Sequence, residues 1–239
     1  MLSLLLFVVK IGMIQTEPQK GELAMKPTEP NAIYVILSQT QTHFGRCIRA
    51  VARQTYNHVS IALDPDLSRV YGFARPNRYA LLQAGLVRES RDRYTMGNGR
   101  PVPVAVYRLP VTQAQHQWVE ETVSDMVDNP AYLYNLFSVL TFPVLKGFAV
   151  RQAYSCVEFA AFLLGTLGYL GEGKAPCTYK PDDLTLLLSG YLVYEGDIRG
   201  CLPPREDRRY FAPLTPSDLA QGLWSLMRIT RRSIQAAVG

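Results

Sequence analysis

The cysteine at position 156 begins a segment with the features of a helix N-terminus. Ser155 and Glu158 fit the S-x-x-E capping box, which makes Ser155 the N-cap and Cys156 the first helical residue. Unpaired backbone N–H groups and the positive end of the helix dipole favour thiolate over thiol at this position, and those N–H groups could help hold a tetrahedral oxyanion. Cysteine is also a small hydrophobe that is often buried and inert. The position indicates a nucleophile only if a base lies beside it.

The candidate base is His58, at the start of a predicted strand. Val59, Ile61 and Leu63 face one way along this strand, and His58 lies on the other, more polar face. A lone histidine of this kind is usually a polar residue with its hydrogen bonds satisfied. Nucleophilic catalysis by cysteine and histidine requires the two side chains to be adjacent in space rather than in sequence. A helix N-terminus facing this strand would satisfy that requirement.

Three segments together resemble a known family. YNHVSIALD, RVYGFAR and YSCVEFAAFLL are similar to the circularly permuted NlpC-type branch of papain-like cysteine hydrolases, which includes the YiiX/YebB-like proteins and the relatives of lecithin–retinol acyltransferase. In the permuted order the histidine precedes the cysteine along the chain, as it does here. The resemblance covers roughly Asn31 to Leu202. It implies that Cys156 is the nucleophile and His58 the base.

The family that the chain resembles usually has a third polar residue, which orients the imidazole from the strand after the histidine strand. The segment Val70–Arg75 contains no histidine, asparagine, glutamine or acid. A tyrosine hydroxyl at Tyr71 could accept the imidazole N–H bond, whereas Arg75 is donor-only and Gly72 offers no side chain. Tyr71 is therefore the candidate for this third catalytic position.

Together these residues predict a thiol-dependent hydrolase or acyltransferase that acts on an amide or ester bond through an acyl-enzyme. The substrate stays open between a peptide or isopeptide amide, a cell-wall stem peptide and a lipid ester. The alternative is a catalytically inactive papain-like binding module, which the missing third polar residue favours.

The strands and helices expected from the sequence indicate an α+β fold, in which a small, mostly antiparallel sheet is packed with helices. The resemblance implies that they have a permuted papain-like arrangement. Hydrophobic runs and alternation indicate strands at Ala32–Leu37, Val59–Leu63, Arg69–Arg75, Pro101–Leu109 and Gly190–Glu195. The two prolines of the fourth segment suggest an edge strand. Helical spacing is present at His43–Gln54, Thr112–Val127, Ser155–Leu167 and Pro181–Leu188. We expect residues 88–100 to form a loop, and Tyr132–Leu145 to be buried in an element of undetermined type.

The chain divides into an N-terminal extension and linker (1–30), a papain-like domain (31–204) and a C-terminal basic helical appendage (205–239). The apolar run Leu2–Val9 is shorter than the ~20 residues of a membrane span, and Met25 could be the true start. A weak membrane anchor is the alternative for this run. In the appendage, Leu219, Leu223, Leu226, Met227 and Ile234 keep helical spacing. We expect this helix to dock on the domain; a membrane-surface helix is the alternative.

The composition of the chain bears on its partners, its cofactors and its compartment. The formal charge of +5 is mild and the basic residues are scattered, so we expect no nucleic-acid partner. Four cysteines without CxxC spacing and three unclustered histidines predict no metal site and no disulfide framework, which fits a reducing compartment. We therefore expect a cytoplasmic monomer without a cofactor. Membrane contact through residues 1–14 or the C-terminal helix is the alternative.

Overall fold

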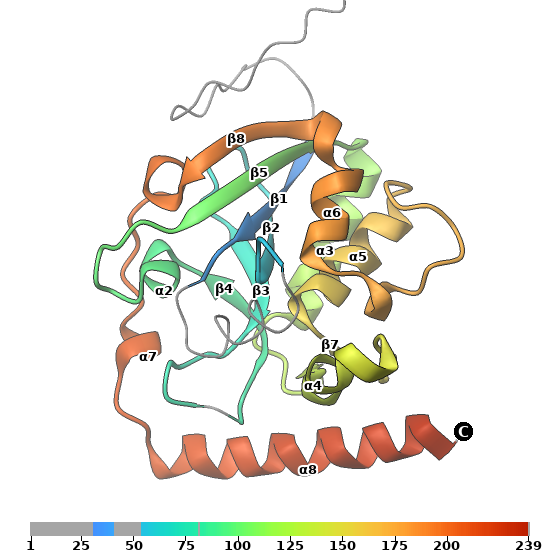
Figure 1. Cartoon of the computed structure of the whole chain (residues 1–239). Helices are drawn as coiled ribbons and strands as arrows, with labels where there is room; N and C mark the ends of the chain where they lie inside the picture. The colour runs from blue at the N-terminus through green and yellow to red at the C-terminus, as the bar shows by residue number, and fades with distance from the viewer. Residues whose placement is uncertain (1–30, 41–53, 81, 239) are drawn as a thin grey trace, which may run out of the picture.

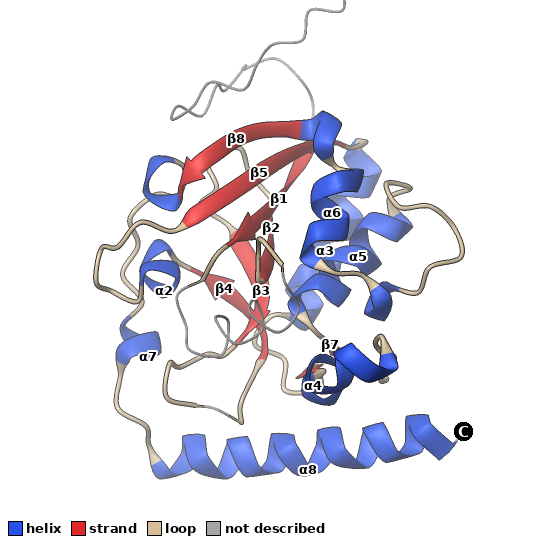
Figure 2. Cartoon of the chain, in the orientation of Figure 1, coloured by secondary structure: helices blue, strands red, loops and turns tan. Residues whose placement is uncertain are grey.

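The computed structural model describes residues 31–40, 54–80 and 82–238, and it has the predicted α+β class (Figures 1 and 2). One antiparallel sheet has the strand order β4-β3-β2-β1-β5-β8, and a short parallel pair joins β6 to β7. The strands are β1 (Ala32–Ser38), β2 (His58–Ala62), β3 (Val70–Ala74), β4 (Gly85–Glu89), β5 (Pro103–Pro110), β6 (Leu133–Tyr134), β7 (Ala153–Tyr154) and β8 (Leu192–Asp197).

Helices lie on both faces of the large sheet. They are α2 (Arg91–Thr95), α3 (Gln113–Met126), α4 (Leu136–Leu145), α5 (Cys156–Thr166), α6 (Pro181–Leu187), α7 (Arg208–Phe211) and α8 (Pro216–Val238), with single 3₁₀ turns at Pro176–Thr178, Ser189–Tyr191 and Ile198–Gly200. In Figure 1, α3, α5 and α6 cover one face, and α2 lies on the other.

The central strand β1 explains why both faces need cover. Alternate residues of its apolar run enter two separate clusters: Val35 and Leu37 pack toward α3, α5 and α6, while Tyr34 and Ile36 pack toward α2 and the 3₁₀ turn at Ile198. A strand that is apolar on both sides must be buried on both sides. The predicted strand at Ala32–Leu37 is confirmed, and it forms the middle of the sheet.

The pairing of β2 creates a gap in which the site can form. Along β1, the strand β2 pairs over its whole length, from Ser38↔His58 to Tyr34↔Ala62. Along β3 it pairs only at Ile61 and Ala62. The first half of β2 therefore has no strand on its β3 side, and α5 packs against β2 and β3 at this opening.

Two sequence predictions are wrong for identifiable reasons. β5 is not an edge strand, because it pairs with both β1 and β8. Pro101 precedes the strand and Pro103 is its first residue, where a missing N–H is tolerated. The loop predicted at residues 88–100 instead contains the end of β4 and all of α2, since the charged residues there have buried partners that no local pattern reveals.

Most other elements agree with prediction. The helices expected at Thr112–Val127, Ser155–Leu167 and Pro181–Leu188 are present as α3, α5 and α6, and the strand expected at Gly190–Glu195 begins two residues later, as β8. The undetermined segment Tyr132–Leu145 forms β6 and α4. The predicted helix at His43–Gln54 and the interpretations of residues 1–30 fall outside the described residues, apart from Gln54 itself.

The C-terminal helix α8 is present and extends along one side of the molecule, next to α4 (Figure 1). Its apolar contact with the domain is made by Ile229 and Leu226, which pack with Phe137 of α4 and Leu133 of β6. The apolar positions Leu219, Leu223, Met227 and Ile234 remain exposed. The helix docks on the domain, as expected, but of the five apolar positions that gave the helical spacing only Leu226 takes part in this contact.

Candidate active site

Cys156 is the first residue of α5, as the capping box predicts. Ser155 Oγ accepts from the Glu158 backbone N–H at 3.2 Å, and Glu158 Oε2 accepts from the Ser155 N–H at 3.1 Å. The cysteine is buried at the gap between β2 and β3. There the His58 side chain and the backbone N–H of Val59 lie close enough to the thiol to lower its pKa. The unpaired half of β2 thus supplies both the imidazole and a backbone donor.

The imidazole of His58 is held from its other side by Glu89, the last residue of β4. His58 Nε2 lies 2.7 Å from Glu89 Oε1, and since an ionised carboxylate only accepts, Nε2 is the donor. This leaves Nδ1 as the ring nitrogen that faces the Cys156 thiol. The three side chains form a continuous line from sulfur to carboxylate, which is the arrangement of a nucleophile, its base and an orienting acid.

Glu89 is buried, and its second oxygen is fully engaged. Ser60 Oγ donates to Glu89 Oε2 at 2.8 Å, and the Tyr94 hydroxyl donates to the same oxygen. Ser60 and Tyr94 also contact each other, with 2.7 Å between their hydroxyl oxygens. A buried carboxylate is tolerated only when it is paired and hydrogen-bonded, and these contacts fix its position.

Gly72 provides the space in which this carboxylate lies. The register Val70↔Glu89 places Glu89 over the face of β3 to which Gly72 also belongs. A Cβ at Gly72 would stand 2.6 Å from Glu89 Oε1 and 3.2 Å from Ser60 Oγ, so any larger residue would displace the acid. Gly72 has no side chain that could orient the imidazole. Its lack of a side chain makes room for Glu89, which takes that role.

The electrostatics of the three groups reinforce one another. Burial opposes charge on the His58 ring, but the adjacent Glu89 carboxylate and the hydrogen bond with Cys156 outweigh it and hold the pKa of His58 well above its usual value. Burial also opposes the thiolate, yet the hydrogen bond and charge of His58, with the Val59 N–H, lower the pKa of Cys156. The pKa of Glu89 is lowered despite its burial, chiefly by the charge of His58. Both shifts favour a thiolate–imidazolium pair.

Tyr134 approaches the sulfur from the β6–β7 pair. Burial together with the nearby negative thiolate of Cys156 raises the pKa of Tyr134 well above its usual value, so the hydroxyl stays protonated and can act as a donor. The parallel register Tyr134↔Tyr154 sets this residue directly beside the start of α5. Sequence reasoning missed Tyr134, and a tyrosine within an aromatic-rich segment gives no local signal.

The neighbouring Asn135 fixes the beginnings of α4 and α5 relative to each other. Its Nδ2 donates to the Phe148 carbonyl at 2.9 Å and to Glu158 Oε2 at 3.2 Å. Burial raises the pKa of Glu158 to about 7, although its bonds from Ser155 and Asn135 work against the shift. Glu158 therefore closes the capping box and also ties Cys156 to the element that carries Tyr134.

The structure brings together Cys156 and His58, but not Tyr71. Tyr71 pairs with Ile61 and packs against the apolar cluster on the α5 side of the sheet. Because side chains alternate along a strand, it faces away from Glu89. The partner of His58 Nε2 is Glu89, one strand further than the family pattern suggested, so the choice of Tyr71 is corrected. The available signal was the spacing of Val87 and Glu89, which puts the carboxylate on the same face of a strand as a buried valine.

The other described cysteines differ from Cys156. Cys177 lies in the 3₁₀ turn at Pro176–Thr178 and is buried. Burial and the nearby Glu158 raise its pKa. Burial raises the pKa of Cys201 to about 12. Cys47 lies outside the described residues. All three described cysteines are free thiols.

A cavity of about 410 Å³ leads to the sulfur of Cys156. Its walls are mainly apolar and come from α4, the start of α5 and the segment before α6. They include Leu140, Phe142, Pro143, Val157 and Tyr179, with Lys146 and Lys180 as cationic members. Ligand sites are typically cavities of this size with apolar walls and a few polar groups.

Within residues 31–40, 54–80 and 82–238, no cluster of three or more histidine, cysteine or acidic side chains could hold a metal ion. Comparisons with protein-family models, with curated proteins and with solved structures find no match.

Proposed function

We propose that this chain is a thiol-dependent hydrolase or acyltransferase, related to the permuted NlpC-type cysteine hydrolases, that acts on an amide or ester bond. One observation carries the proposal: the imidazole of His58 lies between the Cys156 thiol and the buried Glu89 carboxylate, with 2.7 Å between Nε2 and Oε1. A purely structural cysteine does not require a base and an orienting acid in line with it.

In the proposed reaction, the Cys156 thiolate attacks the substrate carbonyl while His58 carries the proton. The oxyanion that forms accepts from the Tyr134 hydroxyl and from the backbone N–H of Cys156, which has no partner within the helix. His58 then donates its proton to the leaving alcohol or amine. The acyl-enzyme passes its acyl group to water or to another acceptor, from which His58 takes a proton, and the thiolate–imidazolium pair is restored.

The apolar walls of the cavity favour a substrate whose acyl part is hydrophobic. Leu140, Phe142 and Val157 line the space beside Cys156, where the acyl group of the thioester would sit. Since the nucleophile must remain a free thiol, we place the protein in a reducing compartment such as the cytoplasm.

The alternative, a catalytically inactive binding module, depended mainly on the missing third polar residue. Glu89 supplies a carboxylate for that role, and Ser60 and Tyr94 hold it in place. Binding alone does not require a buried carboxylate that orients a histidine beside a cysteine, whereas nucleophilic catalysis does, so we favour catalysis.

The test is formation of the acyl-enzyme. We expect p-nitrophenyl esters of short fatty acids to give a burst of nitrophenol and one acyl adduct, located on Cys156 by peptide mass spectrometry. Cys156→Ala should abolish the burst. Cys177→Ala, which removes another buried thiol at the same cavity, should retain it. A burst that survives Cys156→Ala, or no adduct with any ester or amide probe, would leave only the binding-module interpretation.

A further inference from the structure

Exposed apolar side chains gather on two neighbouring helices far along the chain from each other. Among the described residues, large hydrophobic side chains exposed to solvent include five on α8 and three on α4. They are Leu219, Leu223, Trp224, Met227 and Ile234 on α8, at 57% to 60% exposure, and Leu140, Val144 and Leu145 on α4, at 56% to 81%. We call these eight residues the α4–α8 surface. Clusters of exposed apolar side chains of this kind mark binding sites.

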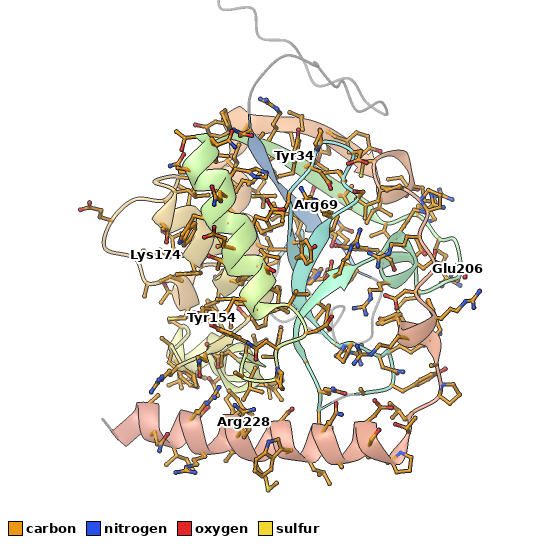
Figure 3. The ribbon with its side chains drawn as sticks, turned by 180° about the vertical axis from the view of Figure 1, so that it is seen from behind. Tyr34, Arg69, Tyr154, Lys174, Glu206 and Arg228 are labelled. Atoms are coloured by element: carbon orange, nitrogen blue, oxygen red, sulfur yellow. The ribbon has the colours of Figure 1, made fainter. Side chains whose placement is uncertain are left out.

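The orientation of α8 is what exposes this surface. The spacing of Leu219, Leu223 and Met227 puts them on one stripe of the helix. Figure 3 shows side chains projecting from α8 away from the rest of the fold, and it labels Arg228 on this helix. Arg228 donates to the Pro130 carbonyl, and Arg232 donates to the Ala131 carbonyl at 3.0 Å. Polar side chains thus attach the helix to the domain while its apolar stripe faces outward.

The charges around this surface are positive, apart from Asp218 in the first turn of α8. Residues 129–157 and 219–239 contain no aspartate or glutamate, and they contribute Lys146, Arg151, Arg228, Arg231 and Arg232. Burial and the charges of Arg228 and Arg151 lower the pKa of Arg232, which indicates that these arginines lie close together without a compensating acid. Arg151 and Arg231 are exposed and have no ion pair among the described residues.

Exposed apolar side chains beside these unpaired arginines favour one kind of binding partner for the α4–α8 surface over another. A second copy of the chain, packed face to face, would bring the same arginines against each other, with Asp218 as the single acid of α8 to pair them. An anionic bilayer supplies both an apolar interior for the stripe and negative headgroups for the arginines. Tryptophan, here Trp224, is also enriched at membrane–water interfaces. No helix among the described residues is long and apolar enough to cross a bilayer, so insertion would be parallel to the surface.

We propose that the α4–α8 surface docks the protein on an anionic lipid bilayer. The helix α4 belongs to this surface and also forms a wall of the cavity beside Cys156, through Leu140, Phe142 and Pro143. Docking therefore brings that wall of the cavity next to lipid. The proposal does not depend on catalysis, because no residue of the surface belongs to the line from Cys156 to Glu89.

The chain contains two tryptophans, and this permits a direct test. Trp118 packs against Phe162 near the core, so in the full-length Trp118→Phe variant the remaining tryptophan is Trp224. Vesicles with equal parts of phosphatidylcholine and phosphatidylglycerol should shift its emission to shorter wavelength and sediment with the protein, and salt should weaken binding. Vesicles of phosphatidylcholine alone should bind much more weakly.

Matched variants locate the contact. Leu223→Glu or Met227→Glu should weaken vesicle binding at least about tenfold, because each places a charge in the apolar stripe. Arg231→Gln should weaken it about fivefold, as expected for one basic residue near an anionic surface. Leu186→Glu is the control: it makes the same change at a leucine that is 77% exposed on α6, and it should bind as wild type does. Cys156→Ala should also bind normally, which separates this proposal from the catalytic one.

Four results would overturn the proposal. One is the absence of binding to anionic vesicles, and another is equal weakening by Leu186→Glu. A third is a dimer in solution that Leu223→Glu converts to a monomer, since a second copy would then cover the surface. The fourth is a shift of Trp224 emission without vesicles when residues 1–24 are deleted, which would make that segment the occupant.

Discussion

The carboxylate of Glu89 reaches His58 by lying across the face of Gly72, so the geometry of the candidate site depends on a residue with no side chain. A Cβ at position 72 would be 2.6 Å from Glu89 Oε1, closer than real Cβ contacts come. Glu89 cannot simply turn aside, because its other oxygen is held by Ser60 and Tyr94. Position 72 therefore controls the orientation of the base through Glu89.

Gly72→Ala should lower kcat by roughly 10- to 100-fold with little change in KM, since displacing the orienting acid by about 1 Å misaligns the imidazole. Steady-state kinetics with an ester substrate measures this split. Gly165→Ala is the matched control, because a Cβ at that helical glycine has no atom within 4 Å. It should keep full activity and gain up to about 1 kcal/mol of stability. Equal losses in both variants would contradict the role assigned to Gly72.

Glu89→Gln removes the charge that stabilises the imidazolium while keeping the size of the side chain. The pKa of His58 should fall toward its usual value, because the Glu89 charge raises it. The pKa of Cys156 should not rise on the acid side, because the Glu89 charge itself raises that pKa and is now absent. We expect kcat/KM to drop about a hundredfold and the alkaline limb of the bell-shaped pH profile to move to lower pH. A lower but unchanged profile would indicate that Glu89 only supports the fold.

The sequence predicted those parts of the site that have a local signal and missed those that depend on tertiary contacts. The capping box located Cys156, and alternation located His58, because both signals are local. Glu89 was missed because Arg88 and Glu89 interrupt a short apolar run and resemble a loop. What buries Glu89 is a set of partners from β2 and α2. Likewise, helical periodicity showed that α8 is amphipathic, but only its tertiary contacts reveal that the apolar stripe faces outward.

Thiol reactivity should distinguish Cys156 from the other described cysteines at acid pH. Its pKa is lowered by His58, whereas burial raises the pKa of Cys177 and of Cys201. Iodoacetamide labelling at about pH 6, resolved by peptide mass spectrometry, should therefore modify Cys156 first. In His58→Ala the labelling profile of Cys156 should move to higher pH, because the imidazolium is gone. Labelling of Cys177 as fast as Cys156 at this pH would show that no ion pair forms.

The last prediction concerns the loss of stability that follows when buried Glu158, at the junction of α4 and α5, becomes ionised. Burial raises the pKa of Glu158 from 4.5 to about 7. A carboxyl with a raised folded-state pKa binds more protons when folded, so it destabilises the fold progressively as pH rises from about 4.5 to 7. The shift corresponds to about 3 kcal/mol. Neutral Glu158→Gln can still accept from the Ser155 N–H but lacks this dependence.

The measurement is the free energy of unfolding of both proteins across this range. The free energy of unfolding of Glu158→Gln, relative to that of wild type, should increase by about 3 kcal/mol between about pH 4 and pH 8. Taking the difference between the two proteins removes the contributions of His58 and Glu89, which both retain. Asp218→Asn is the control: that carboxyl is exposed at the start of α8 and its pKa is lowered by Thr215, so its loss should give no gain at high pH. If the Glu158→Gln difference stayed constant with pH, Glu158 would be ionised throughout and its burial would be offset by its partners.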